Sequence, residues 1–552
     1  MRTLVIALAL LLGAIALAEA EVHVLVTGSA LQSANGIAFG PDGTLYVSSS
    51  IGRAIWLIDP SDGQILERRG PGTGLDSPNA IAVAADGSLY WSDILSGDVG
   101  RRGVDGEVTK QFVAPGVNAL TFSPDGRLFA SINYQGDGLV ELDPMLLGAP
   151  RPIVVASEEN PYPLGFMNVF DFGPDGRLYG PLHAAGMLIG IDVDSCEATS
   201  DPWSDCDIRV LGDDFHMPVS ATFDAHGRLH VVDQPGTVFI VDIVSGERSV
   251  LVADLPPIIH CLAFDPAGDL FVTNYVEGAI YRIAPDGTWH VVRPGGLIAP
   301  QGIVVVEGPD GSEMLYVADS YSLRTFDAAS GRHVRTVPTA ELKPGLAYPH
   351  TVARHGDHLV LASPYKGVVQ IWDPRTETVV EQHVLPFTGN VIAFQDDLVA
   401  IDLLLGGVVW AATGEMILPV DQQQVLLPSG LATDGERLWV SDWATGIVWQ
   451  LTFDARNVLE RLPIAFELPN PEGVALDHQG GLVVVEEGAG RLSRIDLASG
   501  EVHVIVEGLA LGTPGSQVFP PSWFFSGVAV GADGTIYVTS DVDNAIYRIE
   551  PR

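Results

Sequence analysis

The chain repeats one short phrase twelve times. Each copy has an apolar run, a Gly-containing turn and a second apolar run, as in ANGIAFGPDGTLYVSS from Ala34 and PNAIAVAADGSLYWSD from Pro78. One Leu or Ile of the second run marks each copy: Leu45, Leu89, Leu128, Leu178, Leu229, Leu270, Leu315, Leu359, Leu398, Leu438, Leu482 and Ile536. A spacing of about 45 residues with four short strands per copy is typical of propeller blades.

Each copy contains four strand patterns. In the first copy GIAF is the inner strand, and an Asp-Gly turn joins it to TLYVSS. The patterns AIWLID from Ala54 and QILERR from Gln64 follow. Since no long helical pattern interrupts the repeats, the sequence predicts an all-β fold. Twelve blades exceed the usual ring of about four to eight, which favours two six-bladed propellers, over residues 21–287 and 288–552.

The ends of the repeat array predict how the rings close. EVHVLVTG from Glu21 has the pattern of an outermost strand without a blade before it, and the last blade, ending in AIYRIEPR, is one strand short. Closure removes exposed sheet edges. In the simplest scheme, residues 21–28 complete the blade ending near Asp286, and TWHVVR from Thr288 completes the blade ending at Arg552. The alternative exchanges these two strands.

Residues 1–20 predict export. Arg2 precedes the apolar run Leu4 to Leu17, and Ala18-Glu19-Ala20 offers a signal-peptidase site. The run is too short to span a bilayer, so we expect a secreted or periplasmic protein without membrane insertion. A net charge of −40 argues against nucleic acid as a partner.

The three cysteines fall into two groups. Cys196 and Cys206 bracket CEATSDPWSDC, and in an oxidising compartment they predict a disulfide. Cys261 lies in the apolar run IIHCLAF, which indicates a buried thiol.

The position ten residues before the marker in most copies, here called the slot, begins each inner strand and is expected to face the ring axis. It holds Asn35, Asn79, Asn118, Asn168, Val219 and His260 in the first ring, and Gln301, His350, Asn390, Ser429, Glu472 and Ser526 in the second. Five of the eleven Asn residues occupy slots. Converging amide oxygens suit a hard cation such as Ca²⁺, whereas the alternative is that Asn caps the turn into the strand.

The phrases NGIAFGPDGTLYVSSS and AIWLIDP resemble two related groups of six-bladed propellers. One is the lactonase family that includes gluconolactonase and the senescence marker protein, and the other is the NHL-repeat group that includes streptogramin B lyase. The lactonase resemblance implies that slot residues of the types Glu, Asn and Asp hold a metal. The lyase resemblance implies a Glu-x-His pair at a strand exit, but Glu486 is followed by Glu487 and Gly488.

These patterns define two candidate sites. In the first ring, Asn35, Asn79, Asn118 and Asn168 would hold a divalent cation, most suitably Ca²⁺, with charge from Asp93. Asp233 is the alternative source of charge, and His260 would be the base. The alternatives are a packed His and strand-exit Asp residues that only shape turns. The fallback in the second ring is His350, Asn390, Glu472 and Asp442.

The favoured hypothesis is an exported, metal-assisted hydrolase of a lactone or ester. A second hypothesis is a non-catalytic binding scaffold with a small-molecule or protein partner at its axial faces. A third is a C–O lyase like the streptogramin enzymes. The aromatic segment QVFPPSWFFS, residues 517–526, is expected to overhang the mouth of the second ring.

Overall fold

The computed structural model describes residues 20–308, 310–339, 345–421, 423–516 and 525–550, and these form twelve four-stranded antiparallel sheets. In these ranges the α-helix α1 (Pro202–Asp205) has four residues. The described residues also contain four 3₁₀ turns: η1 (Pro71–Thr73), η2 (His183–Ala185), η3 (Val193–Ser195) and η4 (Glu487–Ala489). The all-β prediction is confirmed. No helix of the described residues has the length and apolar character needed to cross a membrane.

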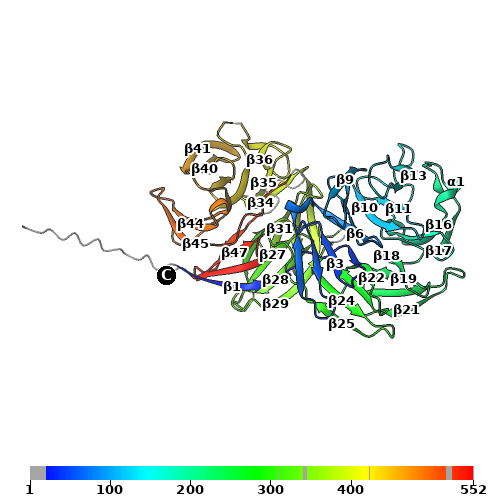
Figure 1. Cartoon of the computed structure of the whole chain (residues 1–552). Helices are drawn as coiled ribbons and strands as arrows, with labels where there is room; N and C mark the ends of the chain where they lie inside the picture. Colours follow the sequence, from blue (N-terminus) through cyan, green and yellow to red (C-terminus); the bar gives the residue numbers. More distant parts are fainter. Residues whose placement is uncertain (1–19, 309, 340–344, 422, 517–524, 551–552) are drawn as a thin grey trace, which may run out of the picture.

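The first ring contains blades 1 to 6 (Figure 1). Blade 1 is β2 (Ile37–Phe39), β3 (Leu45–Ser49), β4 (Ala54–Ile58) and β5 (Ile65–Arg69). Blade 2 is β6 (Pro78–Val83), β7 (Leu89–Asp93), β8 (Asp98–Arg102) and β9 (Val108–Phe112). Blade 3 is β10 (Val117–Phe122), β11 (Leu128–Ile132), β12 (Gly138–Leu142) and β13 (Arg151–Val155). Blade 4 is β14 (Asp171–Phe172), β15 (Leu178–Leu182), β16 (Met187–Ile191) and β17 (Ile208–Gly212). Blade 5 is β18 (Pro218–Phe223), β19 (Leu229–Asp233), β20 (Thr237–Val241) and β21 (Arg248–Val252). Blade 6 is β22 (Ile259–Phe264), β23 (Leu270–Asn274), β24 (Ala279–Ile283) and β25 (Trp289–Arg293).

The second ring contains blades 7 to 12. Blade 7 is β26 (Ile303–Glu307), β27 (Glu313–Asp319), β28 (Ser322–Asp327) and β29 (His333–Pro338). Blade 8 is β30 (Thr351–His355), β31 (His358–Ser363), β32 (Val368–Asp373) and β33 (Thr378–Val384). Blade 9 is β34 (Thr388–Phe394), β35 (Asp397–Asp402), β36 (Gly407–Trp410) and β37 (Met416–Pro419). Blade 10 is β38 (Pro428–Thr433), β39 (Arg437–Asp442), β40 (Ile447–Asp454) and β41 (Asn457–Ala465). Blade 11 is β42 (Pro471–Leu476), β43 (Gly481–Glu486), β44 (Arg491–Asp496) and β45 (Val502–Glu507). Blade 12 is β46 (Val528–Val530), β47 (Ile536–Ser540), β48 (Ala545–Glu550) and β1 (Glu21–Thr27).

Both rings close through apolar contacts between their first and last blades. In the first ring, Trp56 of blade 1 belongs to one core cluster with Phe271 of blade 6. In the second ring, Phe326 of blade 7 shares a cluster with Tyr537 of blade 12. Burial of such side chains between face-to-face sheets drives the closure. The prediction of two six-bladed propellers is confirmed.

The favoured scheme for the closing strands is wrong, and the exchanged scheme is observed. β1 pairs with β48 of blade 12, whereas β25 pairs with β24 of blade 6. Figure 1 shows the dark-blue β1 beside the red C-terminal strands. Both strands have the same alternating pattern, so pairing partners could not be read from it. Gly331 of blade 7 accommodates β1, because it has a φ of +70° and an added Cβ would overlap the carbonyl oxygen of Leu25.

The exchange makes two chain segments cross between the rings, residues 28–36 and 294–302. They lie side by side, because the backbone N–H of Ser29 donates to the carbonyl oxygen of Leu297 at 2.7 Å. The side-chain amide of Asn544 donates to the carbonyl oxygens of both Ser29 and Leu297. The rings are therefore connected twice, at one place.

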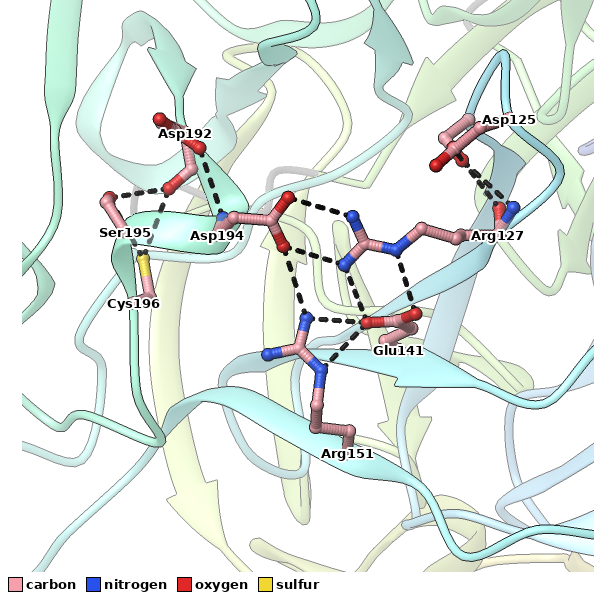
Figure 2. A network of polar contacts seen from close by, with 9 residues as sticks. Asp125, Arg127, Glu141, Arg151, Asp192, Asp194, Ser195 and Cys196 are labelled. Atoms are coloured by element: carbon pink, nitrogen blue, oxygen red, sulfur yellow. Dashed lines mark hydrogen bonds and ion pairs between the residues drawn. The ribbon is translucent and has the colours of Figure 1, made fainter.

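An ionic network joins blades 3 and 4 next to the disulfide (Figure 2). Arg127 donates to Glu141 and to Asp194, each at 2.8 Å. The hydrogen bond from Arg127 lowers the pKa of Glu141 to about 2. Asp194 lies two residues before Cys196, which forms the predicted disulfide with Cys206. Cys261 is buried, as predicted, and burial raises the pKa of its thiol.

Candidate functional site at the ring junction

A cavity of about 480 Å³ lies where the axial mouths of the two rings meet. Slot residues of both rings line it: Asn35, Asn79, Asn118 and His260 from the first, and Gln301 and His350 from the second. The other described lining residues are Ser50, Ile51, Ile94, Leu95, Tyr134, Gln135, Gln234, Tyr275, Ser320, Tyr321, Tyr348, Pro349, Pro364, Tyr365 and Phe387. The sequence suggested one site per ring, whereas the structure joins parts of both slot sets around one cavity.

The slot residues are aimed by irregularities at the start of the inner strands. In blade 2 the pairing of β6 with β7 shifts register between Pro78 and Ile81, around Asn79. The same shift surrounds Asn118 in blade 3 and His260 in blade 6. A bulge bends the strand and redirects a side chain. The position therefore faces the cavity although the rest of the strand packs against neighbouring blades.

The first-ring amides hydrogen-bond to one another around the axis. The side-chain nitrogen of Asn79 donates to the oxygen of Asn118 at 2.5 Å, and the nitrogen of Asn118 donates to Asn168 at 3.5 Å. The oxygen of Asn35 accepts from the Cys261 thiol at 3.8 Å. Three of the four amides that were predicted to hold the cation line the cavity, and the fourth, Asn168, is buried next to Asn118.

This donor set suits Ca²⁺ poorly. Hard cations prefer several oxygen ligands that include carboxylates, whereas no Asp or Glu is among the described lining residues. The amide oxygens of Asn35, Asn118 and Asn168 also accept hydrogen bonds already. The described part of the chain also contains no group of three His, Cys, Asp or Glu side chains placed to hold a metal ion. We therefore assign no step to a metal, and the predicted cation stays a prediction.

The strand-exit aspartates hold loops. Asp93 accepts the backbone N–H groups of Asp76 and Ser77 and pairs with Lys110 at 2.7 Å. Asp233 accepts N–H groups of His216 and Met217, and in the second ring Asp442 accepts those of Leu426 and Leu427. Each carboxylate fixes the loop that leads into the inner strand of its own blade. These contacts favour the turn-shaping alternative for Asp93, Asp233 and Asp442.

The two slot histidines lie on opposite rings and both reach the cavity. The Nδ1 of His260 lies 3.1 Å from the sulfur of Cys261, and its ring contacts Tyr275. The Nδ1 of His350 lies 2.9 Å from the carbonyl oxygen of Gly389. Imidazole is the group that titrates near neutral pH, so these two residues are the proton-transfer candidates of the cavity.

The other fallback residues are not cavity-lining residues. Asn390 donates to the carbonyl oxygen of Ser429 at 3.1 Å. Glu472 is fully buried and accepts the N–H of Ser526 at 2.7 Å. Burial, and then the neighbouring Glu487, raise the pKa of Glu472 well above its ordinary value. Glu472 therefore forms a buried pair of acids with Glu487. It does not share one described site with His350 and Asn390.

Sequence reasoning missed the aromatic side chains that line the junction. Tyr275 of the first ring contacts Tyr321 of the second with ring centroids 5.0 Å apart, and Tyr348 follows at 5.7 Å from Tyr321. A signal was present, because several lining residues directly follow a second strand. These are Ser50, Ile94, Gln234, Tyr275, Ser320 and Pro364. The predicted aromatic overhang falls mainly on residues 517–524, outside the described residues.

Metal analysis tests the cation prediction. From the donor set, we expect purified wild-type protein to hold no stoichiometric divalent ion after dialysis against chelator, measured by inductively coupled plasma mass spectrometry. Asn118→Ala and Glu472→Ala separate the two rings. If the wild type holds one equivalent of ion and Asn118→Ala loses it, the first-ring metal site is supported. If only Glu472→Ala loses the ion, the metal lies beside the buried acid pair.

No protein-family model and no curated protein matches the sequence. Solved structures similar to this chain include a streptogramin B lyase, at 17% identity over 54% of this chain and 94% of that one, with a TM-score of 0.38. A gluconolactonase from Xanthomonas campestris has 18% identity over 46% and 87%, with a TM-score of 0.34. The extracellular domain of a putative one-component system from B. thetaiotaomicron has 12% identity over 94% and 76%, with a TM-score of 0.33. These likenesses concern the propeller fold alone.

Proposed function

We propose that the protein binds an uncharged small molecule in the cavity between its rings. One observation carries the proposal. Although 18% of the residues are charged and the net charge is −40, no Asp, Glu, Lys or Arg is among the described lining residues. The lining instead contains amides, phenols and imidazoles. The volume is in the range of about 300–1,000 Å³ that small-molecule sites occupy.

The lining determines which ligands are favourable. A charged ligand would lose its hydration without meeting an opposite charge among the described lining residues, which is costly in a partly buried site. Hydroxyl and carbonyl groups suit the amides of Gln234 and Gln301, because an amide both donates and accepts. Apolar contacts with Ile94 and Leu95 would bury the remainder of the ligand. We therefore expect neutral molecules with hydroxyl or carbonyl groups.

Hydrolysis of a lactone or ester is the second candidate function. The presence of His260 and His350 on the walls of one cavity favours it, because an imidazole base can activate a water molecule toward a carbonyl carbon. The carboxylate of Asp233 accepts hydrogen bonds from backbone N–H groups instead of facing the cavity. We therefore assign Asp233 no role in the hydrolysis. Action outside the cytoplasm is part of the proposal, and the Cys196–Cys206 disulfide supports it.

A cavity-filling variant tests the proposed site. Wild type and Leu95→Trp are compared by thermal shift and calorimetry with neutral lactones, esters and saccharides, and with their carboxylate counterparts. We expect neutral compounds to bind, carboxylates to bind at least about tenfold more weakly, and Leu95→Trp to lose binding. The matched control is Leu66→Trp on the exposed outer strand β5, where the side chain is 56% exposed. A neutral ligand that binds Leu95→Trp as well as wild type would place the site elsewhere.

The same panel decides between binding and turnover. Release of acid from a neutral lactone or ester would support hydrolysis, and His260→Gln or His350→Gln should then remove the activity while leaving affinity within a few-fold. Binding without release of acid would indicate that the protein binds the ligand and does not hydrolyse it.

A further inference from the structure

A cluster of charged side chains, two of them buried and one partly exposed, joins the two rings. It consists of Glu277 of the first ring with Asp319 and Arg324 of the second, and is called the junction cluster below. Arg324 is 2% exposed and Asp319 is 0% exposed. The Nε of Arg324 donates to Asp319 at 2.5 Å. One of its terminal nitrogens donates to Glu277 at 3.2 Å. A single guanidinium therefore connects carboxylates of both rings.

The same cluster holds the backbone on both sides of the junction. Arg324 also donates to the carbonyl oxygen of Val276 in the first ring at 2.8 Å. Asp319 accepts the N–H groups of Ile298 and Ala299, which belong to the crossing segment 294–302. The carbonyl oxygen of Glu277 accepts the N–H of Gly296 in that segment. The junction cluster thus connects the first ring, the crossing segment 294–302 and the second ring through direct hydrogen bonds.

The cluster stands directly behind residues that line the cavity. In the first ring, Glu277 follows Tyr275 by two residues. In the second ring, Asp319 precedes Ser320 and Tyr321. Tyr275 and Tyr321 are the two aromatic rings that touch across the junction. A rotation of one ring against the other about this edge would separate the two tyrosines and change the width of the cavity.

Cohesion between the rings does not require charge. Burying charged groups carries a large desolvation cost, and well-packed apolar residues of similar volume often replace a buried ion pair without loss of stability. A planar guanidinium constrains the orientation of the groups bonded to it, because its N–H donors have fixed directions. We propose that the junction cluster fixes the angle between the two rings, so that Glu277, Asp319 and Arg324 are positioning residues for the cavity between them.

The experiment follows the angle through a distance between the two rings and needs no ligand. Spin labels are placed at Val244→Cys in the first ring and Val384→Cys in the second, whose side chains are 73% and 78% exposed. Labelling is confined to these sites, because Cys261 is buried and Cys196 and Cys206 form a disulfide. Pulsed electron–electron double resonance then gives the distribution of distances between the rings.

We expect one narrow distance distribution for the wild-type background and a broadened or displaced one for Arg324→Met, with partial recovery in Arg324→Lys. The matched control is Arg282→Met, because Arg282 pairs with Asp265 and Asp269 inside blade 6 alone. That control should keep the wild-type distribution. A folded Arg324→Met protein with the wild-type distribution would overturn the proposal.

A milder variant keeps the test decisive if Arg324→Met does not fold. Glu277→Ala removes only the first-ring carboxylate that accepts from Arg324 and leaves the pair of Arg324 with Asp319. Broadening of the distance distribution is again expected, and an unchanged distribution in Glu277→Ala overturns the proposal. Since distance is the readout, failure of the ligand-binding proposal leaves this result unaffected.

Discussion

Deleting residues 21–27 opens the second ring and leaves the first ring folded: this is the largest effect that we expect. β1 is the fourth strand of blade 12 and pairs with β48 from Glu21↔Glu550 to Thr27↔Ala545. Its Leu25 and Val26 pack against the cluster that joins blades 7 and 12. Loss of the strand removes this packing, the ladder hydrogen bonds and the cover over the β48 edge, which together stabilise by on the order of 5 kcal/mol.

The deletion should not change the thermal stability of the first ring, because the sheets of that ring lie wholly between Ile37 and Arg293. Scanning calorimetry should show one transition near its wild-type temperature and a second that falls by more than about 10 °C or disappears. Limited proteolysis should then cut within residues 303–550. The matched control is Val24→Ser, since Val24 is 56% exposed on β1. Equal loss of both transitions would show that the rings unfold as one unit.

Neutralising Glu487 should stabilise the protein at alkaline pH. Glu487 is largely buried beside Glu472 and Asp541, and burial raises its pKa from 4.5 to about 7. The indole N–H of Trp443 donates to its carboxylate. In Glu487→Gln the amide oxygen can still accept from Trp443, whereas the charge next to the two other acids is gone.

The sign of the effect follows from proton binding. Between pH 4.5 and about 7 the folded protein holds a proton on Glu487 that the unfolded chain has released, so stability falls as the pH rises through this window. Above it the full penalty, about 3 kcal/mol for a shift of this size, is present. We expect Glu487→Gln to exceed wild type by up to that amount at pH 8 and to match it at pH 4.

Urea unfolding at pH 4, 6 and 8 measures this difference. The control is Glu436→Gln, because Glu436 is exposed in the turn between β38 and β39, so this substitution should have the same small effect on the free energy of unfolding at each pH. A Glu487→Gln difference that does not change with pH would mean that the carboxylate keeps its ordinary pKa in the folded protein.

The sequence was informative wherever spacing alone determines structure. The twelve markers, Leu45 through Ile536, set the number of blades, and the short separation of Cys196 from Cys206 allowed their disulfide. The slot spacing also placed Asn79, Asn118 and His260 at one cavity. Each of these inferences depends on contacts within a blade or between neighbouring blades, which a fixed period describes.

Features that depend on how the rings face each other were not predictable. The patterns of β1 and β25 suit either ring, so the exchange depends on where the crossing segments meet. The joint cavity needs Tyr321 and His350 to face the first ring, and no period encodes that orientation. The sequence also could not separate the two roles of the strand-exit aspartates, because a carboxylate that accepts two backbone N–H groups, as Asp93 does, has the same sequence pattern as one that could hold a ligand.

The exchange of closing strands also imposes an order on biosynthesis. β1 is made before the other strands described, yet β46 to β48, with which it completes a sheet, are made roughly 500 residues later. The first propeller can finish as soon as β25 has emerged, whereas β1 must stay unpaired until β48 has been made. A chaperone that shields an extended, apolar amino terminus would thus act on this chain longer than on a propeller that closes with its own strand.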